Sequence, residues 1–150
     1  MKRPLVVDAS IAIKWFLSEI HSDEARLILE SKWELWAPDY IWAEFGSTLR
    51  KKIRLKEITV QEAEVILKDF MRFPIQTHGS KLLLNSAWQL ANDSGATIYD
   101  SLYLALANSR ECFLVTADNT FYQSIKSSKE TTHSRIIWVE DVAMLDKTTK

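Results

Sequence analysis

The stretch Leu5-Val6-Val7-Asp8-Ala9-Ser10 decides the fold of this chain. Its three apolar residues predict a buried strand, and Asp8 follows at the carboxyl end of that strand. Open α/β sheets bind their ligands at this edge. A carboxylate in such a place needs a partner of opposite charge, so we expect the functional site to lie around Asp8.

Strand and helix patterns alternate along the rest of the chain. Further strands are predicted at 33–37, 75–78, 112–116 and 136–139. Helices are predicted at 11–17, 22–32, from Pro38-Asp39 through Ile53, from Thr59 to before Pro74, from about Ser80 to Gly95, around the apolar run 102–107, and at 119–127. This alternation is typical of an α/β fold in which helices cover both faces of a parallel sheet.

The composition suits an ordinary globular domain. The chain has 150 residues, 47% hydrophobic and 26% charged, and no linker-like segment divides it, so we expect a single domain over 1–150. No apolar stretch approaches the ~20 residues of a membrane-spanning helix, and the single cysteine, Cys112, permits no internal disulfide. We therefore expect a cytoplasmic protein without a membrane segment. The formal net charge of −1 argues against a uniformly basic nucleic-acid binder but allows a local basic patch.

Three further acids lie in apolar surroundings like those of Asp8, namely Glu44, Asp100 and Asp118. Taken singly, Asp8, Asp100 and Asp118 have a structural explanation, because each lies at or near a predicted helix N-terminus, where a carboxylate caps free N–H groups. Glu44 has no such explanation, since it is predicted to lie more than one turn inside its helix. The set as a whole therefore favours convergence at one edge of the sheet.

Convergence of these four acids would create strong repulsion. Two carboxylates about 4 Å apart repel by about 4 kcal/mol at an effective dielectric constant of about 20. Without a cation, a crowded group would become protonated or would scatter. Mg²⁺ and Mn²⁺ prefer oxygen ligands and retain waters and phosphates, whereas His21, His78 and His133 are scattered without zinc spacing. We therefore predict a Mg²⁺ or Mn²⁺ site.

Four segments, in order along the chain, resemble the PIN-domain family and within it the VapC-type toxin ribonucleases. They are Val7-Asp8-Ala9-Ser10-Ile11-Ala12-Ile13-Lys14-Trp15-Phe16, Pro38-Asp39 through Glu44, Tyr99-Asp100-Ser101-Leu102-Tyr103-Leu104-Ala105, and Leu114-Val115-Thr116-Ala117-Asp118. The resemblance implies an α/β/α sandwich around five parallel strands. It also implies a Mg²⁺- or Mn²⁺-dependent endoribonuclease that cleaves RNA and has an antitoxin protein as its partner.

The resemblance also assigns roles to residues. It implies that the four acids form the metal site and take part in catalysis, with supporting hydroxyls from Ser10 and Thr116. In the mechanism that these roles imply, a water molecule makes an in-line attack on phosphorus and the metal ion assists it. Many relatives carry another acid after the position of Asp118, where this chain has Asn119. We therefore expect one metal ion rather than two.

RNA phosphates require positive charge, and two features offer it. Lys14 lies near Asp8 in the sequence, and five of the seven residues at 50–56 are basic. Basic residues at a helix C-terminus also complement its dipole. The residues that we expect to contact substrate are Lys14, Arg50, Lys51, Lys52 and Arg54.

The tryptophans Trp33, Trp36 and Trp42 lie close together in the sequence. Tryptophan rings stack on nucleic-acid bases, and tryptophan is also enriched in protein interfaces. We favour an interface for this cluster, in a homodimer or in a groove for an antitoxin helix.

Two other classes of protein remain open. A phospho-accepting receiver domain also gathers acids around Mg²⁺, but it needs paired acids after the first strand, where this chain has Ala9-Ser10. A non-catalytic PIN-like module would bind RNA or a protein without cutting it. The intact set of four acids favours the enzyme, and an assay of metal-dependent cleavage decides between the two.

Overall fold

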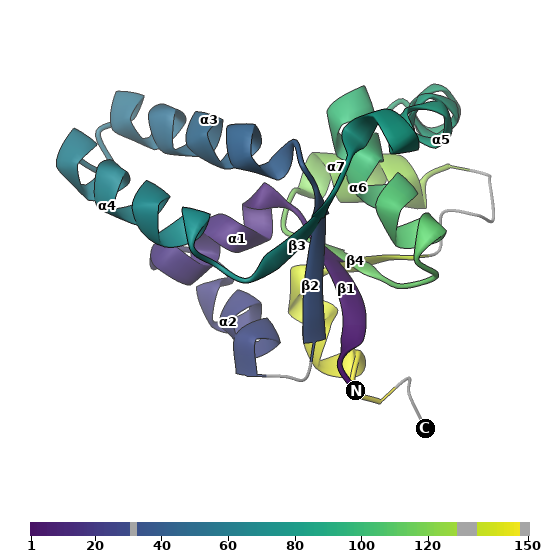
Figure 1. Ribbon diagram of the computed structural model, residues 1–150, viewed down its shortest axis with the longest axis horizontal. Helices are drawn as coiled ribbons and strands as arrows, with labels where there is room; N and C mark the ends of the chain where they lie inside the picture. The colour runs from purple at the N-terminus through teal and green to yellow at the C-terminus, as the bar shows by residue number, and fades with distance from the viewer. Residues whose placement is uncertain (31–32, 129–134, 148–150) are drawn as a thin grey trace.

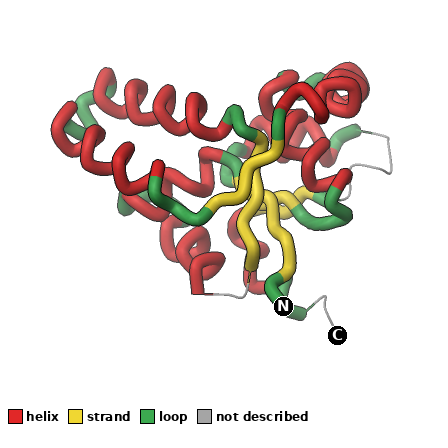
Figure 2. The backbone as a smooth tube through the Cα atoms, viewed as in Figure 1, coloured by secondary structure: helices red, strands yellow, loops and turns green. Residues whose placement is uncertain are grey.

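A five-stranded parallel sheet forms the centre of the computed structural model, which describes residues 1–30, 33–128 and 135–147 (Figures 1 and 2). The strands are β1 (Arg3–Val7), β2 (Trp33–Pro38), β3 (Ile75–His78), β4 (Leu114–Thr116) and β5 (Ile136–Trp138). Their order is β3-β2-β1-β4-β5, and every neighbouring pair is parallel. The predicted α/β/α sandwich with five parallel strands is confirmed.

Helices cover both faces of this sheet (Figure 1). One side carries α1 (Ala9–Phe16), α2 (Ser22–Glu30), α3 (Ile41–Arg54) and α4 (Val60–Met71), and the other carries α5 (Ser80–Ser94) and α6 (Ile98–Ser109). α7 (Asn119–Lys126) connects β4 to β5, and the 3-10 helix η2 (Val139–Met144) follows β5. Within residues 1–30, 33–128 and 135–147, no helix is both long and apolar enough to cross a membrane.

Local signals in the sequence place several element ends correctly. Thr59 and Glu62 form the predicted capping box at the start of α4. Gly95, at φ 78°, ends α5 in the left-handed conformation that glycine adopts without strain. The 3-10 helix was not predicted, and Val139 belongs to it rather than to the last strand. Residues 31 and 32 of the predicted helix 22–32, and His133, lie outside the described residues.

The start of α3 differs from the prediction. Pro38 does not open a helix, because it continues β2 opposite His78 of β3, and α3 begins only at Ile41. The fixed φ of proline suits the end of a strand as well as the start of a helix. Glu44 is therefore the fourth residue of α3, and the prediction that it lies more than one turn inside the helix is wrong.

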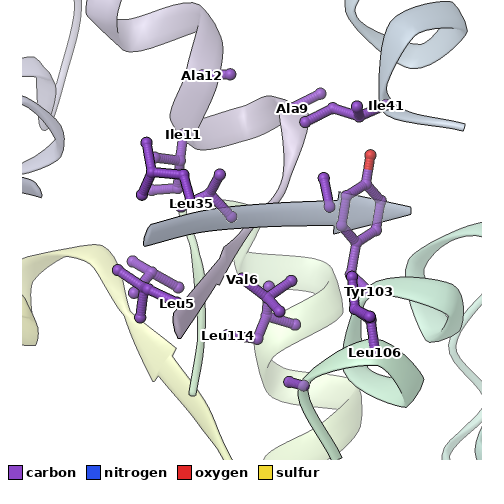
Figure 3. Packing of buried hydrophobic residues seen from close by; sticks show 14 of the residues in the cluster. Leu5, Val6, Ala9, Ile11, Ala12, Leu35, Ile41, Tyr103, Leu106 and Leu114 are labelled. Atoms are coloured by element: carbon purple, nitrogen blue, oxygen red, sulfur yellow. The ribbon is translucent and has the colours of Figure 1, made fainter. Parts of the chain in front are cut away.

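The core explains why the opening strand is so apolar. Residues 5–7 of β1 are fully buried, because helices pack on both faces of this central strand. On α6, every residue from Ser101 to Ala107 is buried. Figure 3 shows Tyr103 of α6 among these core residues, with its hydroxyl directed toward Ile41 at the start of α3. This packing brings α6 and α3 to the same edge of the sheet.

A cluster of phenylalanines holds α3 against α1 and α4. Phe45 and Phe70 stack with ring centroids 3.7 Å apart, and Phe16 meets both rings edge-on, at 5.8 and 6.0 Å. Edge-on and stacked arrangements are the favourable geometries of aromatic pairs. Phe45 directly follows Glu44, so the cluster also fixes the rotation of α3 that directs Glu44.

The three tryptophans have separate surroundings. The guanidinium of Arg3 lies 4.4 Å from the ring centroid of Trp33, and that of Arg110 lies 3.1 Å from the ring centroid of Trp36. Trp42, on α3, packs against the phenylalanine cluster. Positions 33 and 36 are an odd number of residues apart on β2, so their side chains point to opposite faces of the sheet. The prediction that these tryptophans form one cluster is wrong.

Replacing Phe70 with alanine should lower the free energy of unfolding by about 3–5 kcal/mol, because this fully buried ring joins α4 to α3 and α1. Urea unfolding measures the effect. Val65→Ala, on the same helix at a side chain that is 60% exposed, is the control and should cost about 0.5 kcal/mol or less. Equal small losses in both variants would contradict this account of the core.

Candidate active site

Asp8 lies where β1 ends and α1 begins, and its side chain is 3% exposed. Its Oδ1 accepts hydrogen bonds from Ser10 Oγ at 2.5 Å and from the backbone N–H of Ile11 at 3.2 Å. Its Oδ2 accepts a hydrogen bond from Thr116 Oγ1 at 2.5 Å. The capping role expected for Asp8 is thus confirmed. Each carboxylate oxygen has about two lone-pair sites, so Oδ1 is fully occupied and Oδ2 keeps one site for a further ligand.

The two hydroxyls around Asp8 also join β1 to β4. Ser10 Oγ accepts a hydrogen bond from the backbone N–H of Ala117 at 2.9 Å, and Thr116 Oγ1 accepts one from the N–H of Asp118 at 3.1 Å. Thr116 is fully buried. The predicted supporting hydroxyls therefore do more than orient one carboxylate, since they fix the position of Asp8 relative to Asp118.

Glu44 is held by a residue that sequence reasoning missed. The phenol of Tyr103, on α6, donates a hydrogen bond to Glu44 Oε2 at 2.5 Å. Tyr103 is fully buried, and a buried tyrosine hydroxyl needs a partner. Tyr103 lies one turn after Asp100 in a largely apolar helix. The need of its hydroxyl for a hydrogen-bond partner was the signal in the sequence that could have identified it as a site residue.

Asp100 and Asp118 lie at the starts of α6 and α7. Asp118 is the N-cap of α7, and its Oδ1 accepts a hydrogen bond from the N–H of Phe121 at 3.0 Å. Asp100 is in the first turn of α6 but does not cap it, because Thr97 is the N-cap and accepts the hydrogen bond from the Asp100 N–H at 3.0 Å. The capping explanation therefore accounts for Asp118 and leaves the side chain of Asp100 without that role.

Burial and mutual repulsion raise the pKa values of three of these carboxyls. Burial raises the pKa of Asp8 to about 7, against the effect of its two hydroxyl partners, and the charges of Asp100 and Asp118 add to the rise. Burial and then the charge of Asp8 raise the pKa of Glu44 to about 8. Burial and the charge of Asp118 raise the pKa of Asp100 to about 6. The four acids thus act on one another as a single, negatively charged site.

The donor set of this site fits a hard divalent cation, because it offers carboxylate and hydroxyl oxygens and neither histidine nor cysteine. His21 instead lies near Glu140, and His78 contacts the carbonyl of Gly79. Across the described ranges, no three His, Cys, Asp or Glu side chains already stand as a ready-made set of metal ligands. An ion here would take one or two carboxylates and complete its shell with water and phosphate oxygens, as Mg²⁺ commonly does.

A pocket of about 360 Å³ extends from the acids along α1 and α3. Its polar lining residues are Ser10, Lys14, Glu19, Glu44, Thr48, Lys51, Lys52, Glu57 and Asp118. The predicted substrate contacts at Lys14, Lys51 and Lys52 therefore lie beside the acids. Arg50 and Arg54 are exposed and do not line this pocket.

Glu19, a second residue that sequence reasoning missed, links two lysines of the pocket. Its carboxylate pairs with Lys14 Nζ at 2.9 Å and with Lys52 Nζ at 2.7 Å. Lys52 also pairs with Glu57 at 3.1 Å. Burial alone would raise the pKa of Glu19, but the two lysines outweigh burial and lower it. Glu19 is separated by 33 residues from Lys52, so the sequence offered no direct signal for this contact.

Comparison with known proteins finds relatives that are named as VapC ribonucleases. Ribonuclease VapC3 from Pyrobaculum aerophilum is 31% identical over 116 residues, which cover 76% of this chain and 88% of that protein. Ribonuclease VapC9 from Mycobacterium tuberculosis is 28% identical over 114 residues, covering 76% and 85%.

Solved structures share the fold. The crystal structure of PAE2754 from Pyrobaculum aerophilum has a TM-score of 0.66 at 23% identity, covering 97% of this chain and 90% of that chain. VapC20 from Mycobacterium tuberculosis, described as a sarcin-ricin loop cleaving toxin, has a TM-score of 0.62 at 12% identity, covering 80% and 94%. The PIN domain family model matches residues 5–124, a span that includes all four acids. This chain belongs to the PIN domain family.

Proposed function

We propose that this protein is a divalent-metal-dependent endoribonuclease and the toxin of a toxin–antitoxin pair. The observation that carries the proposal is the meeting of four acids from four separate segments at one edge of the sheet, where burial and the charges of neighbouring acids raise the pKa values of Asp8, Glu44 and Asp100. The curated relatives named as VapC ribonucleases support the reaction class. The VapC20 toxin, which shares the fold, supports the biological role.

The bound ion, Mg²⁺ or Mn²⁺, would neutralise the carboxylates, polarise a phosphate oxygen and help to activate water for in-line attack at phosphorus. The ion would draw its one or two carboxylate ligands from Asp8, Asp100 and Asp118. Ser10 and Thr116 orient Asp8 and favour its ionised form, since their hydroxyls donate to its two oxygens. Tyr103 occupies Glu44 Oε2, which leaves Oε1 to hold a water molecule or a second ion.

Substrate binding is proposed for the lysines of the pocket. Lys51 and Lys52 lie near the end of α3, two turns beyond Glu44, and Lys14 faces them from α1. Their positive charge would hold RNA phosphates next to the acids. Arg50 and Arg54, which do not line the pocket, would contribute only at long range.

An antitoxin protein, a second copy of the chain and a cytoplasmic location complete the proposal. The relatives' names support an antitoxin partner, because VapC-type ribonucleases are the toxins of toxin–antitoxin pairs. The lone buried Cys112, which is free of a disulfide, suits a reducing compartment.

A non-catalytic module that binds RNA without cutting it is the second candidate. One observation favours it, namely that the carboxylates of the described residues do not already form a closed set of three metal ligands. Cleavage of RNA by the pure protein would exclude this candidate.

The purified protein should cleave single-stranded RNA with Mg²⁺ or Mn²⁺ and lose this activity in excess EDTA. Asp8→Asn and Asp100→Asn should each reduce the rate by about 100-fold or more, because each removes a ligand charge from the site. Denaturing gel electrophoresis of a labelled RNA measures the cleavage rate.

Asp69→Asn, at an exposed carboxyl on α4, is the charge-matched control and should keep full activity. Undiminished cleavage in EDTA would refute the metal site. A large loss of melting temperature in both site variants would show instead that Asp8 and Asp100 serve stability.

The metal-free protein should lose stability as the pH rises from about 5 to about 8. The pKa values of Asp8, Glu44 and Asp100 are raised by folding, so the folded state binds more protons than the unfolded state in this range. The free energy of unfolding then falls with rising pH, and the stability contributed by protonation is lost as each folded-state pKa is passed. Melting temperatures measured in EDTA over this range test the prediction.

Mg²⁺ should raise the melting temperature more at pH 8 than at pH 5, because protons compete with the ion at the lower pH. Asp8→Asn should flatten the pH dependence in EDTA. The account fails if the wild type and Asp8→Asn show the same slope.

Replacing Lys51 and Lys52 together with glutamine should weaken RNA binding and lower its dependence on salt. The slope of log affinity against log salt should fall by roughly 0.7 for each lost phosphate contact on single-stranded RNA. The control is Arg50→Gln with Arg54→Gln, on the same helix but away from the pocket. Both pairs change the net charge from −1 to −3 (−1 − 2). Equal losses in the two double variants would show that only the overall charge matters.

A further inference from the structure

Two tyrosines lie face to face at the edge of the sheet that carries the acids. The ring centroids of Tyr40 and Tyr99 are 4.9 Å apart, and the ring planes differ by 26°. Tyr40 immediately precedes α3, and Tyr99 is the second residue of α6. The pair therefore joins the N-terminal ends of the two helices that carry Glu44 and Asp100. The proposed metal chemistry does not use either ring.

The tyrosine pair is close to the acids through short covalent and hydrogen-bonded paths. Tyr99 is the immediate neighbour of Asp100, and the carbonyl of Tyr40 accepts the hydrogen bond from the N–H of Glu44 at 3.0 Å. Burial and then the charges of Glu44, Tyr99 and Asp100 raise the pKa of Tyr40. Tyr40 therefore lies within electrostatic reach of Glu44 and Asp100.

Core packing does not explain the position of Tyr99, because this side chain is 54% exposed. A ring that is half in water gains little from the hydrophobic effect. Tyr40 is partly buried and stacks on Tyr99, so it restricts the rotation of the more exposed ring. A fixed, exposed aromatic ring is the surface that single-stranded nucleic acids use for base stacking.

One stripe of α3 orders the parts of the site. Tyr40, Glu44, Thr48 and Lys52 follow one another at intervals of four residues, so they lie on one face of the helix. At 1.5 Å per residue, Tyr40 lies about 6 Å before Glu44 along the axis, and Lys52 about 12 Å beyond it. An RNA strand that places a phosphate at the acids would thus have the lysines on one side and the tyrosines on the other.

We propose that Tyr99, backed by Tyr40, is a stacking platform for one nucleobase of single-stranded RNA, next to the phosphate held at the acids. The proposal rests on the proposed function, in that RNA is the ligand of the acid site. Stacking tolerates any base, because every base has a π face. The platform would therefore select an unpaired nucleotide at this position rather than a particular sequence.

The test is a thermodynamic cycle on a fluorescein-labelled single-stranded RNA oligonucleotide, with binding measured by anisotropy in Ca²⁺ in place of Mg²⁺. A series of otherwise identical oligonucleotides lacks the base at one position each. Tyr99→Ala should weaken binding of the complete RNA by about tenfold. At one position, loss of the base should weaken binding to the wild type by a similar factor and leave binding to Tyr99→Ala unchanged, since the two changes remove the same contact.

Two variants serve as controls. Tyr99→Phe keeps the ring and should bind as the wild type does. Trp88→Ala removes a comparably exposed aromatic side chain, 64% exposed on α5, and should leave binding unchanged. A lowered melting temperature in Tyr99→Ala with unaltered affinity would overturn the proposal in favour of a purely structural role.

Cleavage in Mg²⁺ separates the two proposals. If the wild type cleaves RNA and Tyr99→Ala binds every oligonucleotide as the wild type does, the platform is refuted and the nuclease stands. If the wild type binds but does not cleave, and the cycle still shows the coupling between Tyr99 and one base, the platform stands on a non-catalytic module.

Discussion

Burying an ionised carboxylate at the end of the central strand is the constraint around which this structure is organised. Asp8 is nearly inaccessible, and the free energy of its ionised form depends on donors supplied by the helix α1 and the strand β4. Ser10 and Thr116 satisfy the carboxylate and at the same time tie β1 to β4. The strand order follows from the same need, because β4 must neighbour β1 for the hydroxyl of Thr116 to reach Asp8.

Neighbouring acids make this constraint more severe. Each additional anion raises the cost of ionising the others, and this repulsion adds to burial in raising the pKa values of Glu44 and Asp100. A protein selected for stability alone would replace such a group with apolar side chains. The cost of this cluster therefore supports the proposal that a cation binds to the acids, which the surrounding core holds in place.

Periodicity and short-range chemistry carried most of the fold prediction. The apolar run at 5–7, the capping box at Thr59 and the C-cap at Gly95 are local signals, and the structure contains all three elements as expected. The prediction that Pro38 opens a helix was wrong because the backbone geometry of proline fits both the end of a strand and the start of a helix. Pairing of β2 with β3 places Pro38 in the strand. That placement depends on a strand almost forty residues later, which no local pattern contains.

The sequence predicted site residues only where a charged side chain lies in an apolar segment, because burial of such a side chain costs free energy. Four acids in apolar segments stand out in the sequence for that reason. Glu19 does not stand out, because a glutamate after a helix is ordinary, and the need of the Tyr103 hydroxyl for a partner does not tell which residue that partner is. Their importance arises from partners 59 and 33 residues away. Likewise, Lys51 and Lys52 line the pocket whereas Arg50 and Arg54 do not, and this difference depends on the rotation of α3. The phenylalanine cluster sets that rotation.

If RNA binds as proposed, the ion pairs of Glu19 would make the lysine pocket selective for polymers over small anions. A free phosphate ion that entered the pocket would have to displace a carboxylate already held by Lys14 and Lys52, so it would exchange one anion for another with little net gain. An RNA strand anchored at the acid site presents its next phosphate at a high effective concentration and can win this exchange. The pocket would thus bind the small phosphates of a cell only weakly. It would bind a phosphate that is covalently linked to one already held at the acid site.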